Sequence, residues 1–416
     1  MSEFIKTSLE HVLYDPISGS RPKGGVNNEG EIPSLGGENV TMQGGLNLTA
    51  VKKITSDFFN SMSRGHLKNL DVLINKDGAN TGKSTIYRKS PFLNAAVNEH
   101  LFILRGKDGK IDQEYLHYLL QFSSIRAIIE KKITGSAQPG LNSSFVKNFP
   151  IELAPLPEQK KIASILTSVD EVIETTQKQI DKLQDLKKAT MNELLTQGIG
   201  HTEFKDSELG RIPKSWEVKK VGDLAQITKL AGFEYTSHFD YSIGGDIIAL
   251  RALNLTNGQL DLTNVQTIPT SVSDKLPRSK LFKGDILITY VGVNIGELGH
   301  IDENDRYHLA PNIGKISFHR GLIDTNFMFQ QLLSERVQNS IKNLTGVTSQ
   351  PSLNMGNIRQ IPVLLTKKSE QKKIREILQS IDARIEVKNH KLAQTQALKK
   401  SLMQDLLTGK VRVKVH

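Results

Sequence analysis

The sequence contains no cysteine in its 416 residues. This absence excludes disulfide bonds, thiolate metal sites and cysteine nucleophiles together. The sequence also lacks any run of about 18 apolar residues, so no membrane-spanning helix is expected. Residues 1–15 have neither the basic start nor the apolar core of a secretory signal peptide. We therefore expect a cytoplasmic protein that makes no contact with a membrane.

Catalytic motifs are also scarce. The 11 histidines show no H-E-x-x-H pattern and no other metal-ligand spacing. There is no G-x-S-x-G nucleophile motif, and no Asn- or Asp-Pro-Pro-aromatic loop of the kind that an adenine methyltransferase needs. No pair of carboxylates stands out from the solvated faces of the predicted helices. We predict no catalytic residue and no metal site in this chain.

One segment resembles a phosphate-binding loop. Residues 78–85 read GANTGKST, but the first glycine of the pattern G-x-x-x-x-G-K-[ST] would fall at Asp77. In the second half of the chain the aligned segment is GVNIGEL, from Gly292, which has no lysine and no serine. A nucleotide-binding loop should not align with a plain turn in its own repeat, so we predict no nucleotide site here.

The net charge indicates the kind of partner, and the chain length indicates the number of domains. The formal net charge is +10, and nucleic acid is the commonest partner of such a basic chain. Apolar residues make up 38% of the chain and charged residues 24%. A chain of this length is expected to form two or three domains, each with its own core.

The chain contains a long internal repeat. Residues 158–196 and 370–408 align without a gap at an offset of 212, and 19 of the 39 aligned residues are identical. Gln138-Pro139 and Gln350-Pro351 match at the same offset. A period of this length corresponds to a whole domain and a long helix, not to a solenoid unit. The two globular parts are therefore expected to share one fold and to differ in surface chemistry.

Each repeat contains a predicted long helix with an apolar stripe. The three- and four-residue spacing and the charged flanks are typical of a coiled coil. Pro155, Pro157 and Ser369 are suitable starts, and Gly198 and Gly409 are suitable ends. At about 1.5 Å per residue, each helix would be roughly 55–60 Å long. The residues predicted to pair are Ile162, Ile165, Val169, Ile173, Ile180, Leu183, Ile374, Ile377, Ile381, Ile385 and Leu392.

The two stripes could pair within one chain or dimerise two chains. Their equal length favours pairing within the chain. Antiparallel pairing would place the globular domains at opposite ends of a rod, related by an approximate two-fold axis.

The predicted fold class is α+β, with two mixed, strand-rich domains separated by two long antiparallel helices. Strands are predicted from Ile32, Val72 and His100, and from Asp285 and Lys315 in the second copy. One helix is predicted at 114–133 and one at 326–344. The predicted boundaries are 1–157 for the first domain, 158–197 for the first spacer helix, 198–368 for a linker and the second domain, 369–409 for the second spacer helix, and 410–416 for a tail.

Several segments resemble the specificity subunits of type I restriction–modification systems. They are LPEQKKIASIL from Leu156, SEQKKIREIL from Ser369, LGRIPKSWEVKKVGDL from Leu209, and the TG…QP.LN elements at Thr134 and Thr345. Their order covers nearly the whole chain. One departure is the abrupt start at Met1, which lacks the Ile-Pro…Trp segment that precedes the second domain.

The resemblance implies a function. Each domain would be a target recognition domain that reads one half of an interrupted double-stranded DNA site. The helices would set the gap and recruit two methylation subunits, which use S-adenosylmethionine to methylate adenine. Restriction subunits that use ATP and Mg would then translocate and cleave DNA. The chain itself would bind no cofactor.

Candidate DNA contacts lie on turns that follow apolar strands. Arginine suits guanine and asparagine suits adenine, but Asn and Gly are also common turn formers. The candidates are Arg251, Asn254, Tyr290, Asn294 and Gln350 in the second domain, and Asn39, Asn80, Gln138, Lys76 and Lys83 in the first. Gly36 takes the place of Arg251, so one basic contact has no equivalent in the first domain.

Two other functions remain open from the sequence. The chain could be a coiled-coil adaptor whose two domains bind a protein or another ligand, and salt-sensitive DNA binding would separate the two hypotheses. A self-sufficient methyltransferase or nuclease is disfavoured because the motifs for that chemistry are missing.

Overall fold

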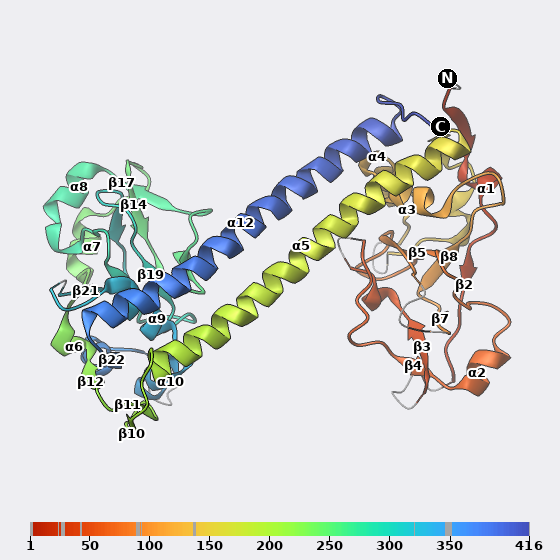
Figure 1. The fold of residues 1–416 in the computed structure, drawn as a ribbon. Coiled ribbons are helices and arrows are strands. Elements are labelled where there is room, and N and C mark those ends of the chain that lie inside the picture. Colours follow the sequence, from red (N-terminus) through yellow and green to blue (C-terminus); the bar gives the residue numbers. More distant parts are fainter. Residues whose placement is uncertain are drawn as a thin grey trace. The chain divides into compact units, whose positions relative to one another are not determined.

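The computed structural model describes residues 3–23, 25, 30–41, 44–88, 92, 94–135, 139–319, 321–345 and 352–415. The chain divides into two compact units. Unit 1 is Met1–Lys178 with Asn389–His416, and unit 2 is Gln179–Lys388. Each unit combines one globular part with a portion of each long helix (Figure 1). Unit 1 is therefore built from two segments of the sequence, whereas unit 2 is one continuous segment.

Two sheets form the globular part of unit 1 in the described residues. The larger has the order β2 (Ile17–Ser18), β8 (Leu101–Leu104), β5 (Val72–Asn75) and β6 (Ser84–Ile86). The smaller has the order β4 (Lys53–Ile54), β3 (Ile32–Leu35) and β7 (Ala96–Val97). Every residue of β5 and β8 is buried, because these central strands are covered on both faces.

Unit 2 repeats this arrangement. Its larger sheet has the order β13 (Ala225–Lys229), β21 (Ile313–Phe318), β18 (Ile286–Thr289) and β19 (Leu298–His300). Its smaller sheet has the order β17 (Gln266–Ile268), β14 (Ile247–Leu250) and β20 (Tyr307–Leu309). In both units the central strand of the smaller sheet is antiparallel to one neighbour and parallel to the other. The prediction of one fold in both globular parts is confirmed.

The remaining strands form two-stranded pairs. β1 (Ile5–Ser8) pairs with β9 (Pro150–Leu153), and β12 (Glu217–Lys220) pairs with β22 (Pro362–Leu365) at the same offset of 212. The other pairs are β10 (Phe204–Lys205) with β11 (Ile212–Pro213) and β15 (Leu255–Thr256) with β16 (Gln259–Leu260). At this offset Phe4 corresponds to Trp216, so the first domain begins with the equivalent strand.

The helix predicted at 114–133 is two helices, α3 (Gln113–Gln121) and α4 (Ser123–Lys132). The helix predicted at 326–344 is likewise α9 (Thr325–Leu333) and α10 (Glu335–Leu344). Phe122 and Ser334 at the breaks are extended, with ψ of 136° and 145°. Phe122 packs into the core of unit 1, and the Ser334 hydroxyl donates to the Gln331 carbonyl, which competes with a continuing helix. The short helices are α1 (Leu9–Val12), α2 (Ser56–Ser61), α6 (Val221–Leu224), α7 (Gly232–His238), α8 (Thr270–Lys275) and α11 (Met355–Gln360).

The long helices are α5 (Leu156–Gln197) and α12 (Lys368–Leu407). In unit 1, Asp170 of α5 and Lys399 of α12 form an ion pair at 2.7 Å. In unit 2, Asp382 of α12 and Lys187 of α5 form the repeat-related pair, also at 2.7 Å. Each pair is the other shifted by 212 residues, with the helices exchanged. In unit 1 the start of α5 shares a core with the end of α12, and in unit 2 the end of α5 shares a core with the start of α12. Within each unit, the two helix portions therefore run antiparallel.

The predicted stripe residues differ in burial. Ile162, Ile180, Ile374 and Ile381 are buried, and the side chains of Ile165, Val169, Ile173, Leu183, Ile385 and Leu392 are half-buried. Ile377 is 39% exposed, whereas the next residue, Leu378, is 1% exposed. Ile377 was wrongly assigned to the stripe, because α12 turns Leu378 into the core of unit 2. Ile162 and Ile374 also pack into globular cores, so the first turns of each helix are part of a domain.

A buried glutamine links the start of each long helix to the helix pair of the globular part, which is α3–α4 in unit 1 and α9–α10 in unit 2. The Gln159 amide oxygen accepts from the Asp112 backbone N–H at 2.9 Å, and its amide nitrogen donates to the Ala154 carbonyl at 2.8 Å. The Gln371 amide oxygen accepts from the Asp324 N–H at 2.9 Å, and its amide nitrogen donates to the Thr366 carbonyl at 2.7 Å. Asp112 and Asp324 cap α3 and α9. The two repeats thus make the same link at the same offset.

The glutamate before each glutamine binds the segment that follows the other long helix. In unit 1, the Arg412 guanidinium donates two hydrogen bonds to the Glu158 carboxylate and stacks over the Phe4 ring. In unit 2, the Glu370 carboxylate accepts from the Ile199 N–H at 2.9 Å and from the Trp216 indole at 3.0 Å.

The hydrogen bonds at Glu370 also change its acidity. Burial opposes ionisation of the carboxyl, but donors from Thr366, Ile199, His201 and Trp216 together hold its pKa below the usual value. The negative charge that completes this end of unit 2 is therefore retained in the folded protein at neutral pH.

We expect Gln371→Leu to lower the free energy of unfolding of unit 2 by about 1–3 kcal/mol, because it leaves the Asp324 N–H without its partner. Trp216 is the single tryptophan, is buried in unit 2, and reports its unfolding by fluorescence in urea. Gln184→Leu, at an exposed position of α5, is the matched control and should change stability by less than about 0.5 kcal/mol. Equal stability of the two variants would contradict the role given to Gln371.

Candidate nucleic-acid interface

Two repeat-related hairpin loops carry several of the predicted residues. In unit 1 the loop joins β5 to β6, and in unit 2 it joins β18 to β19. Each loop contains two glycines with positive φ, Gly78 and Gly82 in unit 1 and Gly292 and Gly296 in unit 2. A residue with a β-carbon is strained in this conformation. This explains why the two loops share their glycines although their other residues differ.

The hairpin geometry explains the absence of a phosphate-binding loop. Such a loop leads from a strand into the N-terminus of a helix, whose N–H groups hold the phosphates. Residues 78–83 instead lead into the antiparallel strand β6. The Lys83 ammonium donates to the Asn80 amide oxygen at 2.6 Å, within the loop. The segment is therefore a turn.

The segment after each repeated Gln-Pro lies against the hairpin loop of its own unit. In unit 1 the Leu141 N–H donates to the Lys76 carbonyl at 2.6 Å. In unit 2 the Leu353 N–H donates to the Tyr290 carbonyl at 3.0 Å. Gln138 and Gln350 themselves lie outside the described residues. The described neighbours show that two motifs far apart in the sequence meet at one edge of each domain.

Asn39 and Asn254 are equivalent, as predicted, but both are buried. The Asn254 amide oxygen accepts from the Arg251 N–H at 3.1 Å, and its nitrogen donates to the carbonyls of Asp261 and Asn264. Asn39 accepts in the same way from the Gly36 N–H at 2.9 Å. Their polar atoms are engaged in holding turns, so the structure contradicts their assignment as residues that contact bases.

Position 251 and its counterpart in unit 1 have different surroundings. Arg251 is half-buried in unit 2, and its guanidinium donates to the Asn264 carbonyl at 3.0 Å. In unit 1 a β-carbon at Gly36 would lie 2.6 Å from the Asn98 amide nitrogen and 2.3 Å from a Glu38 carboxylate oxygen. An arginine at position 36 would therefore require the Glu38 and Asn98 side chains to move.

Arg251 lines an open cavity of about 470 Å³ in unit 2. Tyr235 and Tyr241 form one wall, and the hairpin loop with Val293 and Asn294 forms another. Burial raises the pKa of Tyr241 to about 12, so its hydroxyl is protonated at neutral pH. The cavity thus combines two aromatic faces, a guanidinium and an amide beside an apolar loop, which are the groups that can contact both the faces and the edges of bases.

The other predicted residues have different surroundings. Asn294 is exposed at the loop tip, beside the fully exposed Val293. Tyr290 packs against the core of unit 2, with the Lys229 ammonium 5.7 Å from its ring centre, so its ring has a packing role. In unit 1 the Lys76 ammonium lies 5.6 Å from the centre of the Phe102 ring, and Asn80 is half-buried.

The sequence prediction missed Tyr235, Tyr241, Leu253 and Val293. The aromatic spacing in FEYTSHFDY, from Phe233, was the available signal for the first two. Leu253 and Val293 carry no motif, and only the folded chain shows that these exposed apolar side chains border the same cavity.

The described part of the chain contains no group of three or more His, Asp or Glu side chains that could hold a metal ion. In the same residues, no helix has the length and apolar character needed to cross a bilayer. The cavity supplies hydrogen-bond donors and apolar surface, and its lining includes no carboxylate or histidine. Such an arrangement can bind a ligand through hydrogen bonds and apolar contacts.

Comparison with known proteins places two regions in one family model. Residues 17–185 and 213–397 match the model described as "Type I restriction modification DNA specificity domain". The MjaVIII specificity subunit of a type I restriction enzyme from Methanocaldococcus jannaschii is 32% identical over 351 residues, which cover 83% of this chain and 80% of the relative. The EcoBI specificity subunit from Escherichia coli is 21% identical over 357 residues, covering 82% and 73%.

Solved structures show the same fold. The S subunit of a type I restriction–modification system from M. genitalium superposes with a TM-score of 0.63 at 14% identity and covers 97% of this chain and 96% of its own. A chain from a type I restriction–modification complex superposes with a TM-score of 0.57 at 14% identity, with 98% coverage of both chains. The α+β architecture of this chain is therefore that of solved S subunits.

We expect Asn254→Ala to destabilise unit 2 by about 1–3 kcal/mol, because it removes the acceptor of the Arg251 N–H and the donor to the Asp261 carbonyl, and one of two donors to the Asn264 carbonyl. Asn294→Ala, at the exposed loop tip, should stay within about 0.5 kcal/mol of the wild-type chain. Urea unfolding followed by Trp216 fluorescence measures both. If the two variants are equally stable, Asn254 does not hold the turn.

Proposed function

Because this chain belongs to the type I restriction modification DNA specificity family, we propose that its two globular parts read the two halves of one interrupted double-stranded DNA site. The chain is a specificity subunit with two target recognition domains, and it is a non-catalytic component of a type I restriction–modification system. The observation that supports the proposal is one fold, present twice, with different residues on equivalent loops.

The loop chemistry suggests that the two half-sites are read differently. The unit 1 loop is polar and basic, with Lys76, Asn80 and Lys83, whereas the unit 2 loop places Val291 and Val293 beside Asn294. Lysine attracts phosphates and strengthens binding to any sequence. Apolar side chains can contact the methyl group of thymine, and arginine and asparagine suit guanine and adenine.

We assign the roles of the candidate residues accordingly. Arg251 and Asn294 would contact base edges in the second half-site, and Lys76, Asn80 and Lys83 would contact DNA in the first. Asn39 and Asn254 would position the turns, and Tyr290 would support the loop. Gln138 and Gln350 stay predictions from the sequence.

The long helices would act as the spacer. The antiparallel ion pairs Asp170–Lys399 and Asp382–Lys187 support coiled-coil pairing within one chain rather than dimerisation through a free stripe. In this proposal the recognition domains are residues 1–157 and 198–368, the spacer helices 158–197 and 369–409, and the tail 410–416.

The proposed partners follow from the family. Two methylation subunits would bind S-adenosylmethionine and methylate adenine, and restriction subunits would use ATP and Mg. The chain would meet its DNA in the cytoplasm. The family match favours this function over an adaptor that binds protein or another ligand.

The direct test is reconstitution. We expect the chain with methylation subunits and S-adenosylmethionine to methylate only DNA that contains one interrupted site, whereas the chain alone should methylate nothing. Binding should weaken steeply with salt because it depends on phosphate contacts. Salt-independent binding, or equal methylation of unrelated DNA, would contradict the proposal.

Two substitutions should separate base reading from phosphate binding. Arg251→Ala should cost about 1–3 kcal/mol of discrimination at one position of the second half-site. Lys76→Ala should weaken binding to all sequences and reduce the salt slope by about 1. Competition binding with singly substituted sites measures both effects. A uniform loss for Arg251→Ala would remove it from base recognition.

A further inference from the structure

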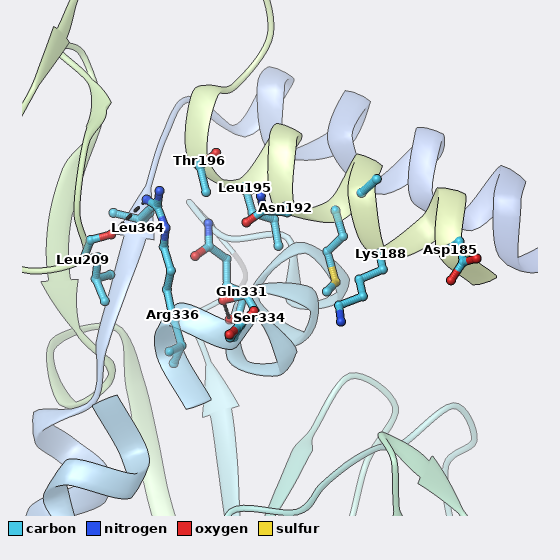
Figure 2. A pocket seen from close by; sticks show the side chains of 14 residues that line it. Asp185, Lys188, Asn192, Leu195, Thr196, Leu209, Gln331, Ser334, Arg336 and Leu364 are labelled. Carbon is cyan, nitrogen blue, oxygen red and sulfur yellow. Dashed lines mark hydrogen bonds between the residues drawn. The ribbon is translucent and has the colours of Figure 1, made fainter. Parts of the chain in front are cut away.

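A cavity of about 340 Å³ in unit 2 has a wall that internal hydrogen bonds hold together. Figure 2 shows this cavity between the last turns of α5 and the pair α9–α10. The Arg336 guanidinium donates to the Leu209 carbonyl at 2.8 Å, and the Ser334 hydroxyl donates to the Gln331 carbonyl at 2.6 Å. These polar groups serve the fold of unit 2. The cavity of about 470 Å³ beside Arg251 differs, because exposed apolar side chains border it.

Three exposed apolar residues belong to the lining of the cavity beside Arg251. Leu253 is 47% exposed, Val291 is 39% exposed, and Val293 is fully exposed. Leu253 lies in the turn after β14, whereas the two valines lie in the loop between β18 and β19. Single apolar residues are ordinary on a protein surface, but a group of them around one cavity marks a contact surface. We call these three residues the apolar rim.

Unit 1 shows that the fold does not require an apolar rim. Glu38, Asp77 and Ala79 occupy the three equivalent positions, in the turn after β3 and in the loop between β5 and β6. The Glu38 carboxylate pairs with the Lys52 ammonium at 2.9 Å, and the Asp77 carboxylate lies 2.6 Å from His100 Nδ1. The same turns therefore form with charged side chains, so folding does not explain the apolar residues of unit 2.

The chemistry of the apolar rim is complementary to one group of a DNA duplex. Phosphates present charged oxygens, and most base edges present hydrogen-bond donors and acceptors. The methyl group of thymine is the only methyl group that the four bases present in the major groove. Burial of this group against leucine and valine side chains removes apolar surface from water on both sides of the contact. In a domain that reads DNA, an apolar rim therefore suits thymine.

We propose that Leu253, Val291 and Val293 bind the methyl group of one thymine in the half-site that unit 2 reads. This inference rests on the proposed function, because it takes double-stranded DNA as the partner. It assigns base recognition to side chains that carry no hydrogen-bonding group. Glu38 and Asp77 of unit 1 place carboxylates at equivalent positions, so the contact with thymine distinguishes the two half-sites.

Deoxyuridine in place of thymine removes the methyl group and leaves the hydrogen bonds of the base pair unchanged. The test uses the full chain with its methylation subunits and the interrupted DNA site, in which each thymine is replaced singly. Competition binding then gives the ratio of the affinities for the thymine site and the deoxyuridine site. We expect one replacement to weaken binding of the wild-type complex about fourfold, as for the loss of one buried methyl group.

Substitutions in the apolar rim should remove this sensitivity. Val293→Ser changes a fully exposed side chain, so the variant should fold as the wild-type chain does. We expect it to lower the affinity ratio at that thymine from about four to about one, because the methyl group loses its contact. Leu253→Asn should lower the same ratio. Ile243→Ser is the matched control, because Ile243 is 69% exposed in unit 2 and lies outside the cavity lining, and it should keep the wild-type ratio.

Equal affinity of the wild-type complex for all thymine and deoxyuridine sites would overturn the inference, and so would an interrupted site whose specified positions contain no thymine. In both cases methylation of that site would leave the proposed function intact. An unchanged ratio in Val293→Ser would also overturn it, because other residues would then contact the methyl group. Loss of the ratio in Ile243→Ser would show an effect that is not local to the apolar rim, with the same consequence. A wild-type complex that selects no interrupted site would instead contradict the proposed function itself.

Discussion

The attachment of each long helix to a globular domain depends on one buried glutamine. Gln159 and Gln371 accept a hydrogen bond from the backbone N–H that begins the globular helix pair of their unit, and each also donates to the strand-to-helix connection before its own helix. A buried amide with these partners fixes the direction in which the helix leaves the domain. The neighbouring glutamates hold the segment that follows the other long helix. The short repeated motif Glu-Gln therefore joins, in each unit, a long helix, the globular part and the segment that follows the other long helix.

This constraint explains which residues the two repeats share. Identical residues occupy the glutamine links and the ion pairs Asp170–Lys399 and Asp382–Lys187. Each of these residues either has the repeat-related partner in both units or pairs with a residue of the other repeat. The residues of the two hairpin loops, by contrast, have diverged. Under the proposed function, two readers stand in equivalent settings and read two different half-sites, which requires this division between shared and divergent residues.

The sequence predicted what repetition and periodicity encode. The offset of 212, the long helices and the central strands from Val72 and Asp285 follow from patterns in the chain. It did not reveal the breaks at Phe122 and Ser334, because tertiary packing of Phe122 and a local hydroxyl contact override the helical pattern there. Asn254 was mistaken for a base contact, since a turn-holding asparagine and an exposed one look alike in sequence. The cavity beside Arg251 was missed because its walls come from segments some 50 residues apart.

The central claim is that this chain alone selects which DNA sites its system methylates. The most direct measurement is genome-wide mapping of methylated adenine in cells with the gene, without it, and with the gene restored. The account predicts one interrupted motif, with two short half-sites and a fixed gap, whose methylation disappears on deletion and returns on restoration. An unchanged pattern of methylated adenine after deletion would contradict the account.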